Sequence, residues 1–250
     1  MSAATPIPRT LYIHDDLSDD LQALGECSRS WRLGQTLFAL LRRDAGRIVV
    51  LTLAQQIDGL IVRGAHAPFA TAVGVGRAGV RVAEAVHTRT GWFPSIHRVD
   101  LWREEDDDGA YVLAGPAPLA SQVRALPHGD SVAVVDDTVF SGLTLRTVLA
   151  ALPRTGTQRL HAFCLRAVAE SLPSVADLAP VTVGFAAPGR ILDDVSFINA
   201  SGLVRRGAIR RTGRPPLAFY ERPEWMEAWF PVDHGRITEL CRDLAAELDG

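Results

Sequence analysis

The chain has 250 residues, of which 47% are hydrophobic and 22% are charged, and its formal net charge is −3. This composition is that of an ordinary globular protein. It argues against a general binder of nucleic acids or membrane surfaces, which usually carries a basic excess. All 26 side chains counted as lysine or arginine are arginine, so Schiff-base chemistry and the lysine-containing phosphate loop are excluded.

The cysteines and the first residues of the chain bear on its compartment. Cys27, Cys164 and Cys241 are odd in number and far apart, which favours a reducing compartment over a disulfide framework or a paired zinc motif. The first residues hold no apolar segment of signal-peptide length, and no apolar run reaches the roughly 18 residues of a membrane span. We therefore expect a cytoplasmic protein with no membrane and no nucleic-acid partner.

The predicted elements alternate along the chain. Residues 1–32 show little periodicity and are expected to form an irregular or partly helical lead-in. Residues 69–86 predict a strand, a glycine turn and a helix. Further strands are predicted over 47–53, 95–102, 110–115, 131–137, 160–168 and 181–187, and further helices over 33–43, 143–152 and 234–248.

This alternation predicts an α/β fold. Strands that are apolar throughout and alternate with helices indicate a parallel sheet covered by helices on both faces. After residue 188, prolines interrupt the pattern and aromatic residues gather. We therefore expect an α/β core at residues 1–187 and an aromatic cap with a closing helix at residues 188–250, with the lead-in contributing to the cap.

The stretch SVAVVDDTVFSGLT at residues 131–144 is the most informative. An apolar strand ends there on two aspartates, and a loop of small and hydroxyl residues leads into a helix. In parallel sheets, ligands bind beyond the carboxyl ends of the strands. Amide groups at a helix N-terminus bind anions, and Gly142 lets the main chain approach a phosphate. The stretch is therefore suited to a ribose 5-phosphate, which carries both hydroxyls and a phosphate.

Residues 132–144, VAVVDDTVFSGLT, resemble the signature with which type I phosphoribosyltransferases bind phosphoribosyl pyrophosphate (PRPP). The resemblance implies that Asp136 and Asp137 hold the ribose 2- and 3-hydroxyls. It also implies Mg²⁺ as a cofactor, held through PRPP, with the two aspartates as candidate ligands. The residues implied to wrap the 5-phosphate are Thr138, Val139, Phe140, Ser141, Gly142, Leu143 and Thr144, of which Phe140 is bulky for its place.

A second glycine-containing unit precedes this motif. Residues 72–86 contain GxGxxG spacing, which is weak as a dinucleotide fingerprint because its first glycine lies within the predicted strand. The unit is similar to the loop that grips pyrophosphate in the same family. The resemblance implies that Gly76, Arg77, Ala78 and Gly79 form this loop, with the guanidinium of Arg77 pairing to the diphosphate.

Residues 97–113 occupy the place of the family's mobile loop, which closes over the substrate. Arg98 and Arg103 are candidates to reach the pyrophosphate. The acidic run Glu104 to Asp108 would repel a diphosphate if it folded inward, so we expect it to be a solvated loop tip.

The implied activity is transfer of the 5-phosphoribosyl group from PRPP to an acceptor with release of pyrophosphate. Asp136, Asp137 and Arg77 are its candidate catalytic residues, and the scattered histidines offer no general base. The acceptor is either a nucleobase or, given the many acidic residues, a cationic amino sugar. Tyr220, Trp225 and Trp229 either stack on it or form the core of the cap. A homodimer is compatible with the sequence.

Two other functions compete with this interpretation. A protein of the same fold that senses PRPP or nucleotides would keep residues 131–144 and have no transferase activity. A phospho-acceptor site, as in receiver domains or dehalogenase-type phosphatases, would normally include a lysine, and the phosphatases use Asp-x-Asp rather than adjacent aspartates. The chain has no lysine, which disfavours this second alternative.

Overall fold

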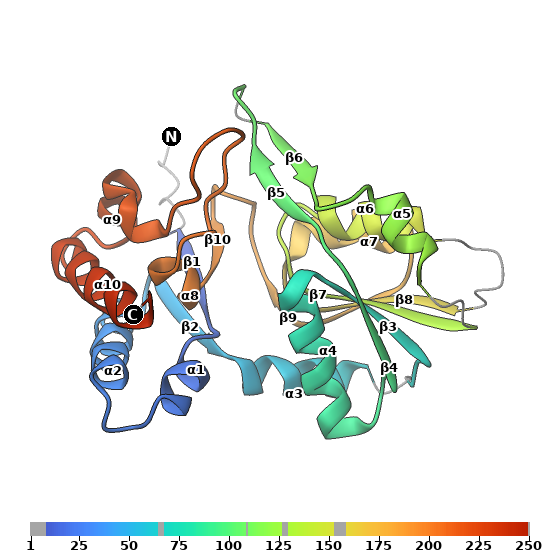
Figure 1. The fold of residues 1–250 in the computed structure, drawn as a ribbon, viewed down its shortest axis with the longest axis horizontal. Helices are drawn as coiled ribbons and strands as arrows, with labels where there is room; N and C mark the ends of the chain where they lie inside the picture. The colour runs from blue at the N-terminus through green and yellow to red at the C-terminus, as the bar shows by residue number, and fades with distance from the viewer. Residues whose placement is uncertain (1–8, 65–67, 109, 127–129, 153–158, 250) are drawn as a thin grey trace, which may run out of the picture. The chain divides into compact units, whose positions relative to one another are not determined.

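The structure is a computed structural model, and it describes residues 9–64, 68–108, 110–126, 130–152 and 159–249. The chain divides into two compact units (Figure 1). The five-strand unit comprises residues 54–104 and 111–193, and the three-strand unit comprises the described residues up to 53, residues 105–110 and the chain from 194 onward.

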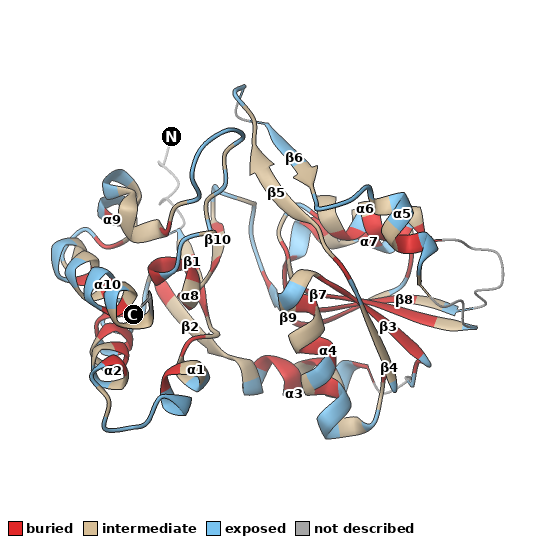
Figure 2. Ribbon diagram, in the orientation of Figure 1, coloured by how far each residue is buried: buried red, intermediate tan, exposed pale blue. Residues whose placement is uncertain are grey.

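A parallel sheet forms the centre of the five-strand unit. Its strand order is β4 (Ser95–Val99), β3 (Thr71–Val75), β7 (Ser131–Val139), β8 (Arg159–Val168) and β9 (Val181–Ala187). The three middle strands are almost entirely buried (Figure 2), which explains why their sequences are apolar throughout rather than alternating. The predicted α/β class with a parallel sheet is confirmed.

Helices cover both faces of this sheet, as predicted. In Figure 1, α5 (Leu119–Arg124), α6 (Leu143–Ala151) and α7 (Leu172–Ala176) lie on one face, and α3 (Leu53–Arg63) and α4 (Gly76–Thr90) lie on the other. A short 3-10 helix, η1 (Ala169–Ser171), follows β8. The helix α3 was not expected, because its sequence lies between two more distinctive strand patterns.

The segment expected to be a mobile loop contains a two-stranded sheet of β5 (Trp102–Glu105) and β6 (Tyr111–Ala114). The loop expectation for residues 97–113 was therefore wrong in part, although residue 109 lies outside the described residues. The acidic run stabilises its own turn, because the Asp106 carboxylate accepts a hydrogen bond from the main-chain N–H of Asp108 at 3.1 Å.

The three-strand unit has a parallel sheet of its own, in the order β10 (Val195–Asn199), β1 (Thr10–Asp15) and β2 (Ile48–Thr52). The expectation of an irregular lead-in was wrong for residues 10–15, and residues 1–8 lie outside the described part. Around this sheet are α1 (Ser18–Ala23), α2 (Arg29–Leu41), α8 (Ala200–Val204), η2 (Phe219–Glu221), α9 (Pro223–Trp229) and α10 (His234–Asp249).

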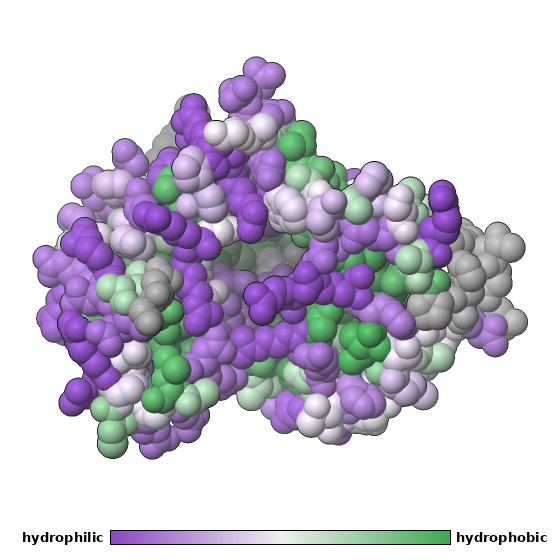
Figure 3. Space-filling model, viewed as in Figure 1, coloured by the Kyte–Doolittle hydropathy of each residue, from purple (hydrophilic) through white to green (hydrophobic). Residues whose placement is uncertain are grey.

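In the view of Figure 3, hydrophilic residues cover most of the visible face, and hydrophobic residues form smaller areas between them. The exposed large hydrophobic residues are dispersed along the described chain: Leu24, Val62, Tyr111, Val112, Leu192 and Val232. Among the described helices, none combines the length and the apolar character needed to span a bilayer.

Helix α4 packs closely on the sheet at Gly79. A Cβ atom at this position would lie 2.3 Å from the main-chain oxygen of Val135 in β7. We expect Gly79→Ala to lower the free energy of unfolding by about 1–3 kcal/mol, because the helix must shift away from the strand. Urea denaturation measures the change. The control is Gly235→Ala in α10, where an added Cβ meets nothing within 4 Å; equal effects at both positions would contradict the packing argument.

Candidate active site

Strand β7 carries the aspartate pair, and it is longer than the sequence predicted. It continues past Asp137 to Val139, because the pairing with β8 extends to the partners Val139 and Ala167. The prediction that the strand ends on the aspartates was therefore wrong by two residues. The two carboxylates are held on a paired strand, which restricts their main chain more than a loop would.

The two aspartates have different environments. Asp136 is 6% exposed, and its carboxylate accepts a hydrogen bond from the Asp137 main-chain N–H at 2.8 Å. Burial raises the pKa of Asp136 well above its usual range, and the neighbouring charge of Asp137 raises it further. Asp137 is half-buried, and its carboxylate accepts a hydrogen bond from the Thr138 hydroxyl at 3.2 Å.

A small pocket lies where β7 ends and α6 begins. Its lining residues are Arg103, Asp136, Thr138, Val139, Phe140, Ser141, Gly142, Leu143, Thr144 and Leu145. All seven residues predicted to surround a 5-phosphate are therefore brought together with Asp136. Gly142 has a φ of +77° and immediately precedes the first residue of α6, Leu143. Amide groups at the start of a helix are favourable for an anion.

Arg103 reaches this pocket from β5. Its guanidinium carbon lies 6.0 Å from the ring centre of Phe140 and 6.0 Å from that of Tyr111, which is within the range of cation–π attraction. Its positive charge also acts to lower the pKa of Asp136, against the larger effect of burial. Phe140, which is bulky for a phosphate loop, thus contributes a ring against which the arginine lies.

The other two candidate pyrophosphate arginines are placed differently. Arg98 in β4 forms an ion pair with Asp100, with 2.6 Å between Nε and the carboxylate oxygen. Arg77 is exposed, and among the described residues it has no hydrogen bond or ion pair. Residues 76–79 form the first turn of α4 rather than a separate loop, so the predicted loop geometry was wrong. The strand β3 runs directly into this helix.

Arg166 in β8 was not among the site residues predicted from the sequence. Its side chain is 1% exposed, and its Nη2 atom lies 3.2 Å from the Asp137 carboxylate. The Cys164 thiol on the same strand donates a hydrogen bond to the Arg166 main-chain oxygen at 2.8 Å. The sequence held a signal for this residue, since an arginine in the largely apolar run LHAFCLRAV is unusual for a buried strand.

The sequence of residues 40–185 matches the family described as the phosphoribosyl transferase domain. The match covers more than half of the chain and includes both the aspartate motif and residues 76–79. The chain belongs to the phosphoribosyl transferase domain family. The resemblance noted in the sequence is confirmed, and the parallel five-strand sheet is like that of type I phosphoribosyltransferases.

Solved structures with a similar fold include several phosphoribosyltransferases. A purine phosphoribosyltransferase from Pyrococcus horikoshii is 18% identical, with 59% of this chain and 89% of that chain covered and a TM-score of 0.41. An adenine phosphoribosyltransferase from Rhodothermus marinus is 15% identical, with 54% and 79% covered and a TM-score of 0.41. A hypothetical protein from Neisseria gonorrhoeae with bound ppGpp is 14% identical, with 58% and 81% covered and a TM-score of 0.41. No curated protein matches the sequence.

The candidate acceptor residues of this phosphoribosyl transferase domain protein lie in the three-strand unit. Tyr220, Trp225 and Trp229 are partly buried and pack against its hydrophobic core. The rings of Trp225 and Phe219 are 4.4 Å apart between centres. These aromatic residues therefore contribute to the core of their unit.

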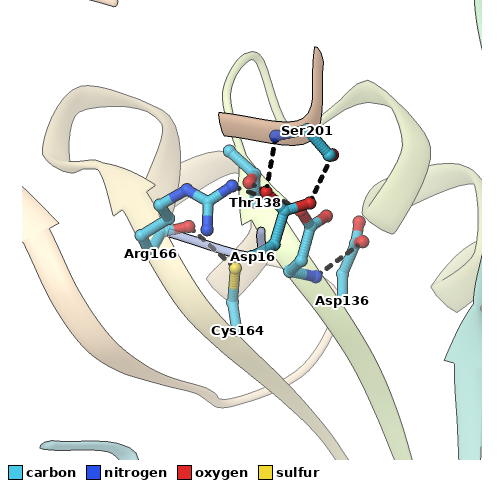
Figure 4. Close-up of polar contacts among 7 residues, drawn as sticks. Asp16, Asp136, Thr138, Cys164, Arg166 and Ser201 are labelled. Carbon is cyan, nitrogen blue, oxygen red and sulfur yellow. Dashed lines mark hydrogen bonds and ion pairs between the residues drawn. The ribbon is translucent and has the colours of Figure 1, made fainter. Parts of the chain in front are cut away.

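Several acidic residues that suggested a cationic acceptor have partners inside the protein. The Asp16 carboxylate accepts a hydrogen bond from the Ser201 main-chain N–H at 2.8 Å (Figure 4). Asp20 pairs with Arg205 at 3.0 Å. In the acidic run, Glu105 pairs with Arg211 at 3.0 Å, whereas Asp107 and Asp108 are exposed. Some of these carboxylates therefore stabilise the fold. Within the acidic run Glu104 to Asp108, the exposed residues are those at its end, Asp107 and Asp108.

The thiols give a direct test of burial in both units. Cys27 is exposed, whereas Cys164 and Cys241 are buried. Burial raises the pKa of both buried thiols, to about 12 for Cys241. Because the thiolate is the reactive form, we expect one thiol to react rapidly with a disulfide reagent in the native protein and all three after unfolding. Cys27→Ser should remove the fast reaction, and rapid reaction of a second native thiol would contradict the structure.

Proposed function

We propose that the protein transfers the 5-phosphoribosyl group of PRPP to an acceptor and releases pyrophosphate. The observation that supports this most strongly is the pocket that combines Asp136, the segment from Thr138 to Leu145 and Arg103. It places an acidic group suited to sugar hydroxyls beside a helix N-terminus and a cation suited to phosphates. Family membership supports the same chemistry.

In this proposal each part of PRPP has its own partners. Asp136 and Asp137 bind the ribose hydroxyls, and the segment 138–144 binds the 5-phosphate through main-chain amides and hydroxyls. Arg103 binds the pyrophosphate, and the first turn of α4 with Arg77 is a further candidate for it. For Arg98 to bind the pyrophosphate, its ion pair with Asp100 must first break.

The reaction breaks the bond between ribose C1 and the pyrophosphate oxygen while the acceptor attacks C1 from the opposite face. Positive charge grows on the sugar ring in the transition state, and negative charge grows on the leaving group. The aspartates orient the ring and lie near its positive charge, while Arg103 stabilises the leaving group. Such chemistry depends on positioning and electrostatics, so a general base on the protein is not required.

The pocket fits a magnesium ion that arrives with the substrate. Among the described residues, no cluster of three or more His, Cys, Asp or Glu is arranged to hold a metal ion by itself. Mg²⁺ is commonly bound by one or two carboxylates together with substrate phosphates, and Asp136 and Asp137 would be those carboxylates. When bound, the ion neutralises charge on the diphosphate.

The acceptor is proposed to be a nucleobase or an amine-bearing sugar. The test incubates the protein with PRPP, Mg²⁺ and a panel of bases and amino sugars, and follows pyrophosphate release. Release with one acceptor class supports the proposal and names the acceptor. Tight PRPP binding without release on any acceptor would instead support a PRPP-sensing protein.

Arg103 and Phe140 give a more local prediction. We expect Arg103→Met to weaken PRPP binding about tenfold, because a cation is lost beside the phosphates. Phe140→Leu should weaken it about two- to fivefold, which corresponds to the loss of a cation–π contact near the surface. Isothermal titration measures both. Arg98→Met is the comparison, since Arg98 is already paired; an Arg98 effect larger than that of Arg103 would contradict the assignment.

A further inference from the structure

A buried arginine lies beside the aspartate pair. Arg166 is the largest side chain that is fully buried among the described residues, at 1% exposure. It lies on β8, where it pairs in register with Thr138 of β7. Its Nη2 atom donates a hydrogen bond to the Asp137 carboxylate at 3.2 Å.

This arrangement is costly for the fold. Removing a guanidinium from water carries a large desolvation penalty, and apolar residues of similar volume often stabilise such positions better than an ion pair does. The neighbours of Arg166 on the strand, Leu165 and Ala167, are apolar and fully buried. The strand therefore supplies a charge at a place where packing alone would favour an aliphatic side chain.

The charge lies where the proposed substrate would need it. Two adjacent carboxylates in a poorly solvated site repel a substrate that carries a phosphate and a diphosphate, and this repulsion is stronger in a low-dielectric site than in water. Arg166, on the neighbouring strand β8, offsets the negative charge of the Asp137 carboxylate. Its contact also restricts the Asp137 side chain, which is 18% exposed.

We propose that Arg166 is a positioning residue for PRPP, which holds the Asp137 carboxylate toward the ribose and supplies an internal counter-charge that lessens the dependence of PRPP binding on Mg²⁺. The inference rests on the proposed function. It assigns Arg166 no contact with substrate, so its effect must pass through Asp137.

The test measures PRPP binding by titration at low and at saturating Mg²⁺. We expect Arg166→Met to weaken binding about tenfold at low Mg²⁺ and clearly less at saturating Mg²⁺, because the added cation replaces part of the lost charge. Arg166→Lys should keep the wild-type dependence on Mg²⁺. The matched control is Arg159→Met, an exposed arginine at the other end of β8, which should bind as the wild type does.

A second background shows whether the effect passes through Asp137. In Asp137→Asn, the further change Arg166→Met should weaken PRPP binding clearly less than it does when Asp137 is present. This double variant leaves no unpaired buried charge, so it keeps the test valid if Arg166→Met alone unfolds. Equal losses from Arg166→Met in both backgrounds would overturn the inference, as would an Arg166→Met protein that binds PRPP as the wild type does. Failure of the wild-type protein to bind PRPP would contradict the proposed function itself.

Discussion

Asp136→Asn is expected to lower the rate of pyrophosphate release from PRPP by about 10²-fold or more while the protein stays folded. Asp136 is the aspartate that lines the pocket, and its carboxylate is assigned to the ribose hydroxyls and to the developing positive charge. Asparagine keeps the size of the side chain and removes the carboxylate that is assigned to these two roles. Steady-state kinetics with a productive acceptor measures the effect.

The folding of this variant is expected to change little. Burial raises the pKa of Asp136, so the fold does not depend on its ionised form, and a neutral amide suits the site. Asp137→Asn differs, because it leaves Arg166 buried beside a neutral partner and should cost about 3 kcal/mol of stability. Asp130→Asn is the control, since Asp130 is exposed and immediately precedes β7, at the end of the strand opposite to the aspartate pair. Full activity of Asp136→Asn would exclude the proposed site.

Gly142→Ala is expected to weaken PRPP binding at least about tenfold and to destabilise the protein by about 1–2 kcal/mol. The residue has a φ of +77°, where a side chain is strained. A Cβ would also lie 3.2 Å from Val175 and 3.3 Å from Ser174. The strain should displace the turn before α6 and its amide groups, on which the 5-phosphate would rest. Titration with PRPP and thermal unfolding measure the two effects.

Gly213→Ala is the control that separates the effect of backbone strain on stability from an effect on PRPP binding. Gly213 lies in the three-strand unit with a φ of +69°, and a Cβ there meets nothing within 4 Å. It should show a similar cost of backbone strain and unchanged PRPP affinity. If both variants lost affinity equally, the weakened binding would reflect general destabilisation, and the turn would lose its assigned role.

The sequence by itself determined that a parallel sheet covered by helices is present and where the aspartate motif lies. The strands β7 and β8 are buried on both faces, so each is an apolar run that stands out from its surroundings in the sequence. The motif is contiguous, and its acidic, glycine and hydroxyl residues are brought together by one strand end and one helix start. A motif of this kind can be recognised from the sequence because its residues are adjacent in the chain.

Only the tertiary structure decided the rest. Strand β1 is short, and one of its partners, β10, lies far along the chain. No local sequence pattern therefore predicts that these two strands pair. Arg103 reaches the pocket through the β5–β6 pairing, and Arg166 meets Asp137 because β8 lies beside β7. These contacts join residues that are distant along the chain, and their energy depends on burial and distance, which residue order alone does not specify.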